Sequence, residues 1–163
     1  MSRKILAALT LMLLCAPAAG RAAGPDACAL LSRDEIAAAT GRKAQGFDRA
    51  HEEGGVPVCA GRAGEASLTL RATSRADAEA ATGQPALDRL RGKGAKVELT
   101  RAGTATCVRV TTQQTMSSAS GRAFCTAPAG DRAAILETEA ASIMDLIPPA
   151  TLGALAERAA ARL

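Results

Sequence analysis

The sequence predicts an α+β fold in which a mostly antiparallel sheet is covered on one face by helices and held by two disulfides. Segments with strand-like alternation follow one another between helical segments, which is typical of this class. Four cysteines follow an N-terminal segment that looks like a leader, and an even number in an exported chain favours disulfides. Aromatic residues make up only 1% of the chain, so the core must consist mainly of small side chains, each of which buries little apolar area. Disulfides would add stability to such a core.

The N-terminal segment has the pattern of a secretory signal peptide. Arg3 and Lys4 supply positive charge, residues 5–15 are apolar, and residues 16–20 are small and include one proline. We expect cleavage near residues 18–22. Removing residues 1–20 lowers the formal net charge from +4 to +2, so the basic character of the whole chain says little about its partners.

This pattern divides the chain into a signal peptide over residues 1–22 and a single α+β domain over residues 23–163. We therefore expect a periplasmic or secreted protein. The apolar stretch is shorter than the ~20 residues that a bilayer crossing needs, so we expect no transmembrane segment in the mature chain. A lipoprotein acylated at Cys15 is less favoured, because bulky Leu14 precedes that cysteine.

The first element of the domain is a short helix over residues 33–40. Ser32 and Glu35 have the spacing of a capping box, and Gly41 is typical of the left-handed residue that ends a helix. A helix of this length is marginal by itself. A disulfide from Cys28 would tie its start to the rest of the domain.

The rest of the chain alternates between strand and helix patterns. Expected strands cover residues 56–59, 66–71, 95–99, 104–112, 121–127 and 132–138, with turns at 61–64 and a polar hairpin loop at 113–120. Expected helices cover residues 75–82, 85–91 and 149–163. Ser74 and Asp77 begin the first of these three helices.

The four cysteines allow three disulfide connectivities. If the apolar residues of strands 104–112 and 121–127 face the core, Cys107 and Cys125 fall together on the opposite side, so alternation permits a bond between them. Cys28 and Cys59 then pair by elimination. A zinc site is the alternative, but the sequence has no Cys-x-x-Cys pair and only one histidine.

The segment Cys28-Ala-Leu-Leu-Ser-Arg-Asp-Glu-Ile, the helix that ends at Gly41 and the later Cys59 carry a resemblance. They resemble an uncharacterised family of small exported bacterial proteins and lipoproteins that open with Cys-x-Leu-Leu-Ser/Thr-x-x-Glu/Asp-Val/Ile. Some members have been likened to the Mog1/PsbP-type α+β fold. The resemblance covers residues 26–70, implies a Cys28–Cys59 bond, and carries over no catalytic residue. The chain departs from the family in its second cysteine pair and its poor lipid-attachment site.

Catalytic chemistry finds little support. A serine or cysteine nucleophile needs a histidine base, and His51 is the only histidine. It precedes Glu52 and Glu53 and two glycines, so we interpret this run as a solvated polar loop rather than a general base or metal site. We expect no catalytic residue, no metal ligand and no cofactor.

A basic cluster is the weak candidate for binding: Arg89, Arg91, Lys93 and Lys96. Such a cluster contacts phosphate or anionic lipid in some proteins, although it is most often a solvated helix end. It lacks the phosphate-loop pattern. The chain has no Trp or Tyr for base stacking, so we expect no nucleic-acid partner.

The sequence therefore predicts an exported, disulfide-stabilised, non-enzymatic domain that binds an unknown protein or small-molecule partner in the cell envelope. Two alternatives remain open. One is a small hydrolase that uses His51 with nearby acidic residues, and the other is a protein that binds anionic surfaces through residues 89–96.

Overall fold

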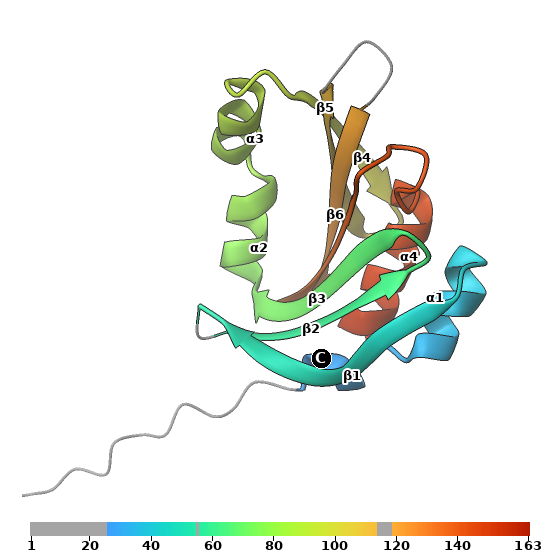
Figure 1. Cartoon of the computed structure of the whole chain (residues 1–163). Helices are drawn as coiled ribbons and strands as arrows, with labels where there is room; N and C mark the ends of the chain where they lie inside the picture. Colours follow the sequence, from blue (N-terminus) through green and yellow to red (C-terminus); the bar gives the residue numbers. More distant parts are fainter. Residues whose placement is uncertain (1–25, 55, 114–118) are drawn as a thin grey trace, which may run out of the picture.

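A seven-stranded antiparallel sheet with helices on both faces organises the chain (Figure 1). The structure, a computed structural model, describes residues 26–54, 56–113 and 119–163. The expected signal peptide and most of the expected hairpin loop lie outside the described residues. The strands are β1 (Ala44–Glu53), β2 (Val56–Ala63), β3 (Ala66–Ser74), β4 (Lys96–Ala102), β5 (Ala105–Gln113), β6 (Ala119–Ala129) and β7 (Arg132–Ala140). The helices are η1 (Ala27–Ala29), α1 (Arg33–Thr40), α2 (Arg75–Thr82), α3 (Gln84–Arg91) and α4 (Pro149–Ala160).

The sheet joins two antiparallel meanders. Its strand order is β1-β2-β3-β7-β6-β5-β4, so β1–β3 form one half and β4–β7 form the other. The central pair, β3 and β7, is far apart in sequence, and Arg71 lies opposite Ile135 in its register. Helices α2 and α3 connect β3 to β4, which is the far edge of the sheet.

The central strand β7 has buried residues on both of its faces. On β7, Leu136 belongs to the main core with α4, whereas the neighbouring Ile135 packs with Ala78 of α2. Helix α4 packs across β4–β7, and α1 lies on the same face (Figure 1). The α+β class, the antiparallel sheet and the two disulfides are confirmed, and α1 and α4 cover one face as expected. Helices α2 and α3, which the sequence also predicted, lie on the opposite face, so the helices of the structure cover both faces of the sheet.

Local capping signals gave accurate helix starts. Ser32 accepts a hydrogen bond from the Glu35 amide at 3.2 Å, and the Glu35 carboxylate accepts one from the Ser32 amide at 2.9 Å, which confirms the capping box. Gly41 ends α1 with φ 66°, in the left-handed region. Helix α2 begins after Ser74, whose hydroxyl accepts from the Asp77 amide at 3.1 Å.

Strand β1 was not predicted, and the expectation that His51 lies on a loop is wrong. His51 is exposed within β1 and lies opposite Val58. The register shifts between Gly46 and Ala50, and Phe47 has φ 63°. Such a bulge breaks the alternation by which strands are recognised. The Phe47 ring packs onto Gly61, where a Cβ would overlap it. Gly61 pairs with Gly46 and Leu68 and thus belongs to β2, so the expectation that it begins a turn is wrong.

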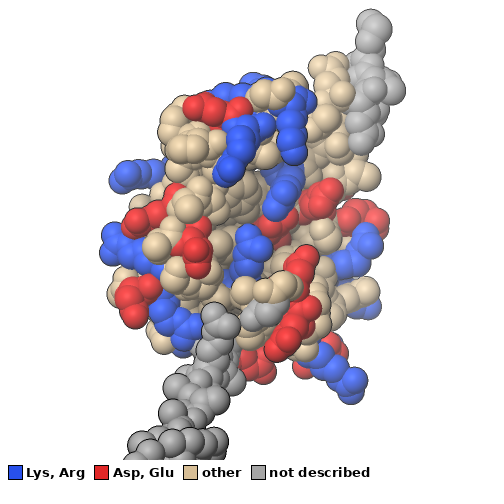
Figure 2. Space-filling model, turned by 90° about the vertical axis from the view of Figure 1, so that its left-hand side faces the viewer, with Lys and Arg blue, Asp and Glu red and all other residues tan. Residues whose placement is uncertain are grey.

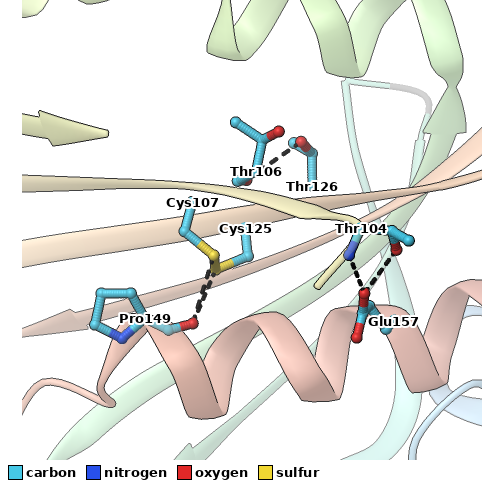
Figure 3. The surroundings of a disulfide bond; sticks show 7 residues. All are labelled: Thr104, Thr106, Cys107, Cys125, Thr126, Pro149 and Glu157. Atoms are coloured by element: carbon cyan, nitrogen blue, oxygen red, sulfur yellow. Dashed lines mark hydrogen bonds between the residues drawn. A yellow bond between two sulfur atoms is a disulfide. The ribbon is translucent and has the colours of Figure 1, made fainter. Parts of the chain in front are cut away.

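Both expected disulfides are present and lie in the main core. Cys107 and Cys125 are directly opposite each other on β5 and β6, with 4.0 Å between their Cα atoms, and Cys28 of η1 is bonded to Cys59 of β2. The sulfur atoms of the cross-strand bond lie 3.4 and 3.6 Å from the carbonyl oxygen of Pro149 (Figure 3). Because a disulfide has no S–H to donate, we regard these as packing contacts with the first turn of α4.

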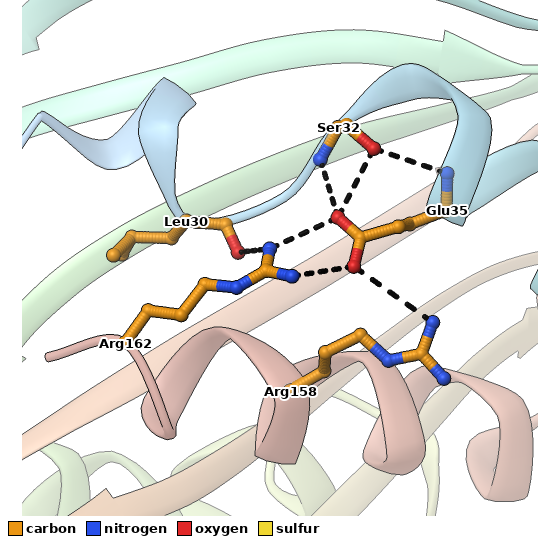
Figure 4. A network of polar contacts seen from close by, with 5 residues as sticks. All are labelled: Leu30, Ser32, Glu35, Arg158 and Arg162. Atoms are coloured by element: carbon orange, nitrogen blue, oxygen red, sulfur yellow. Dashed lines mark hydrogen bonds and ion pairs between the residues drawn. The ribbon is translucent and has the colours of Figure 1, made fainter.

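Two carboxylates fasten α4 to its surroundings. Glu157 accepts hydrogen bonds from the amide and, at 2.6 Å, from the hydroxyl of Thr104 in the turn between β4 and β5 (Figure 3). The Thr104 hydroxyl, followed by its amide, lowers the pKa of Glu157 below its usual value. Five residues further along the chain, Arg162, just beyond α4, pairs with Glu35 of α1 (Figure 4). These contacts tie the C-terminal region of α4 to the β4–β5 turn and to α1.

Candidate functional site

A cavity of about 570 Å³ lies between α2–α3 and the sheet, on the face opposite α4. We call it the helix–sheet cavity. Figure 2 looks onto this side of the molecule, where lysine and arginine side chains gather around a hollow. Its lining consists of Arg71, Ala81, Ala86, Arg89, Leu90, Lys93, Val110, Thr112, Ser120, Gly121, Arg122, Phe124, Glu137 and Glu139.

The packing of the two short helices explains the cavity. Ala78 anchors α2 on β7, while Leu87 anchors α3 on the apolar residues of β5 and β6. Ala81 and Ala86 lie near the α2–α3 junction and reach only a short way toward the sheet. Small side chains between two anchoring points leave volume that larger ones would fill.

The floor of the cavity contains a neutralised ion pair. Arg122 of β6 binds Glu137 of β7 through two contacts, Nε to Oε1 at 2.5 Å and Nη2 to Oε2 at 2.8 Å. Its guanidinium lies 5.8 Å from the centroid of the Phe124 ring, within the range of a cation–π contact. The hydrogen bond from Nη2 and the ion-pair contact of Nε together hold the guanidinium plane in a defined orientation. Glu139 lies opposite Arg122 in the β6–β7 register.

Three further cations line the cavity. Arg89 lies on α3, Lys93 lies two residues beyond the end of α3, and Arg71 lies on β3. In the parts of the chain that the structure describes, none of these three forms an ion pair. Besides Glu137, the described part of the lining holds one carboxylate, that of Glu139, so the three cations leave a net positive charge there, which attracts anions.

The structure divides the basic cluster that the sequence singled out. Arg89 and Lys93 line the helix–sheet cavity. Arg91 instead pairs with Asp88 at 3.0 Å, and Lys96 of β4 pairs with Glu98 at 2.8 Å. The lysine lowers the pKa of Glu98, as expected of an ion pair.

Sequence reasoning missed Arg71 and Arg122. Strand alternation placed Arg71 on the face opposite the buried leucines of its strand, but it could not say what that face meets. Only the pairing of β3 with β7 and of β7 with β6 brings both arginines beneath α2–α3.

Among the described residues, neither a histidine nor a cysteine lines this site. His51 lies on edge strand β1, and it is not part of the cavity lining. All four cysteines of the described chain are paired. Within residues 26–54, 56–113 and 119–163, no group of three His, Cys, Asp or Glu side chains is arranged to hold a metal ion. The lining combines charged side chains with an apolar surface, which suits the recognition of a charged ligand.

Comparisons with protein-family models, with curated proteins and with solved structures gave no match to this chain. The resemblance of its N-terminal motif to small exported bacterial proteins thus stays a prediction. Among the described residues, no helix has the length and apolar character that a membrane crossing requires.

Proposed function

We propose that this chain is an exported, disulfide-stabilised, non-enzymatic domain that binds a small anionic ligand in the helix–sheet cavity. One observation indicates that the ligand is negatively charged. The cavity is lined by Arg71, Arg89 and Lys93, and these three side chains have no carboxylate partner among the described residues. An anion that enters would gain charge-assisted hydrogen bonds and relieve the repulsion between these cations. The cavity volume lies within the range of about 300–1,000 Å³ that is usual for small-molecule sites.

Export is supported by two features of the chain. The two disulfides fit an oxidising compartment, because the cytosol keeps most thiols reduced. The N-terminal residues have the charge and hydropathy pattern of a signal peptide. Together they favour the periplasm or the extracellular space as the place where the ligand is met.

The two alternatives gain less support. For a hydrolase, His51 and its neighbours Glu52 and Glu53 lie along one edge strand, where successive side chains point to opposite faces of the sheet. For binding to an anionic surface, two of the four cations in the predicted cluster are already paired. The remaining two line a hollow, which suits a small ligand better than a flat surface.

Isothermal titration calorimetry with inorganic phosphate, citrate, benzoate and decanoate tests this proposal. We expect at least one of these anions to bind, and the double variant Arg89→Ala/Lys93→Ala to weaken that binding about tenfold or more. The matched control is Arg91→Ala/Lys96→Ala, which removes the same charge from the same segment outside the cavity. Equal losses in the two double variants, or no binding of any anion, would contradict a ligand site in the cavity.

A further inference from the structure

We infer that the ligand is an amphipathic monoanion, a single acidic group on an apolar body, and this inference rests on the proposed function. A positively charged cavity alone does not distinguish such a ligand from phosphate or a polycarboxylate. The arrangement of apolar and acidic groups in the lining makes the distinction.

An apolar surface runs along one side of the cavity. Leu90 and Ala86 contribute it from α3, and Val110 and Phe124 contribute it from the strands below. Leu90 packs at the border of the small core that includes Val110 and Phe124, so this surface continues from the protein interior into the cavity. Contact with an apolar body would remove this surface from water, whereas a hydrated ion would leave it wet.

The carboxylates of the lining disfavour a second negative charge. Glu137 lines the floor on β7, between β3 and β6, and already binds Arg122 through both of its oxygens. Glu139 lies beside this pair on β7 and forms no side-chain ion pair among the described residues. A polyanion spread over the cavity would approach these two carboxylates, and like charges that meet in a partly desolvated site repel.

One acidic group can avoid this repulsion. Placed between Arg71 of β3 and Arg89 of α3, it would receive hydrogen bonds from the floor and from the helical wall. The apolar body would then lie along Leu90 and Phe124. Small-molecule sites generally combine a mainly apolar lining with a few polar groups that fix the ligand's orientation.

Calorimetry with matched probes, at pH 7 and constant ionic strength, tests the inference on the protein with both disulfides formed. The probes are decanoate, decylammonium, phosphate and citrate. We expect decanoate to bind at least tenfold more tightly than phosphate or citrate, and decylammonium, which has the same chain length and the opposite charge, not to bind measurably.

The outcomes separate this inference from the proposed function. If phosphate or citrate binds as tightly as decanoate, and the Arg89→Ala/Lys93→Ala variant loses that binding, the anion site stands and the amphipathic ligand is refuted. If decylammonium binds as well as decanoate, the acidic group is not recognised and both statements fail. If no anion binds, the proposed function fails and the inference fails with it.

Two variants locate the apolar body. Leu90→Gln should weaken decanoate binding about tenfold while leaving the much weaker citrate binding unchanged. Ala86→Glu places a carboxylate on the wall and should also weaken decanoate binding at least tenfold. Its matched control is Ala80→Glu, because Ala80 is exposed on α2 and outside the lining. Circular dichroism melts confirm folding, and unchanged decanoate binding in both folded cavity variants would refute the inference.

Discussion

The contact between Glu35 and Arg162 joins the first and last helical segments, and we expect removal of its charge to destabilise the protein. The Glu35 carboxylate accepts hydrogen bonds from Arg162 Nη2 at 2.6 Å and Nη1 at 2.9 Å, from the Ser32 amide at 2.9 Å and from the Ser32 hydroxyl at 3.0 Å (Figure 4). Arg162 also donates to the carbonyl of Leu30 at 2.7 Å. The substitution Glu35→Gln keeps the shape and the capping role but removes the charge.

The expected magnitude follows from the pKa of Glu35. Hydrogen bonds from Arg162, followed by the Ser32 amide, lower the pKa of Glu35 from 4.5 to about 2. A shift of that size corresponds to about 3 kcal/mol at full value. The side chains of Glu35 and Arg162 are 23% and 42% exposed, so solvent screens the pair, and we expect Glu35→Gln to cost about 1–2 kcal/mol at pH 7.

The sign of the pH dependence is fixed by the direction of the shift. Because the pKa of Glu35 is lower in the folded chain than in the unfolded one, its contribution is fully present above pH 4.5 and is lost as the pH falls toward 2. Urea unfolding of both proteins from pH 7 to pH 2.5 measures the difference in free energy of unfolding. That difference should shrink below pH 4.5.

A control and a double-mutant cycle complete this experiment. Arg91→Gln disrupts the exposed pair with Asp88 and should change stability by less than about 0.5 kcal/mol. Combining Glu35→Gln with Arg162→Gln should show a coupling energy of about 1 kcal/mol. A Glu35→Gln variant as stable as the parent at pH 7, or a stability difference that is the same at pH 7 and pH 2.5, would refute this account.

Two further predictions concern the packing of α4. Replacing Cys107 and Cys125 together with alanine should lower the free energy of unfolding by about 3 kcal/mol, because the bond closes a loop with a sequence separation of 18 residues. Urea unfolding measures this loss, and an unchanged unfolding midpoint would contradict the prediction. Gly153→Ala should destabilise by about 1–3 kcal/mol despite alanine's better helix propensity, because the new Cβ would lie 2.6 Å from the Ala102 Cβ. Gly92→Ala, whose Cβ would be 3.4 Å from the Asp88 carbonyl oxygen, is its control and should change stability by no more than about 0.5 kcal/mol in the same assay.

The sequence determined the elements that depend on neighbouring residues. The capping box of Ser32 and Glu35 predicted the start of α1 and Gly41 predicted its end, because both signals act within a few residues. Alternation along β5 and β6 predicted that Cys107 and Cys125 could meet, because side chains two apart share a face. Strand β1 escaped prediction because its bulge at Gly46 and Phe47 interrupts that same alternation.

Only the tertiary structure decided where the candidate site lies. Arg89 and Lys93 stood out in the sequence as neighbours in a basic segment, but nothing local separated them from Arg91, which turns to Asp88. Arg71 joins them because β3 pairs with β7 at the centre of the sheet, a contact between residues distant along the chain. Such pairing depends on the burial of both faces of the sheet at once, and the placement of α2–α3 over the second face is what encloses the cavity.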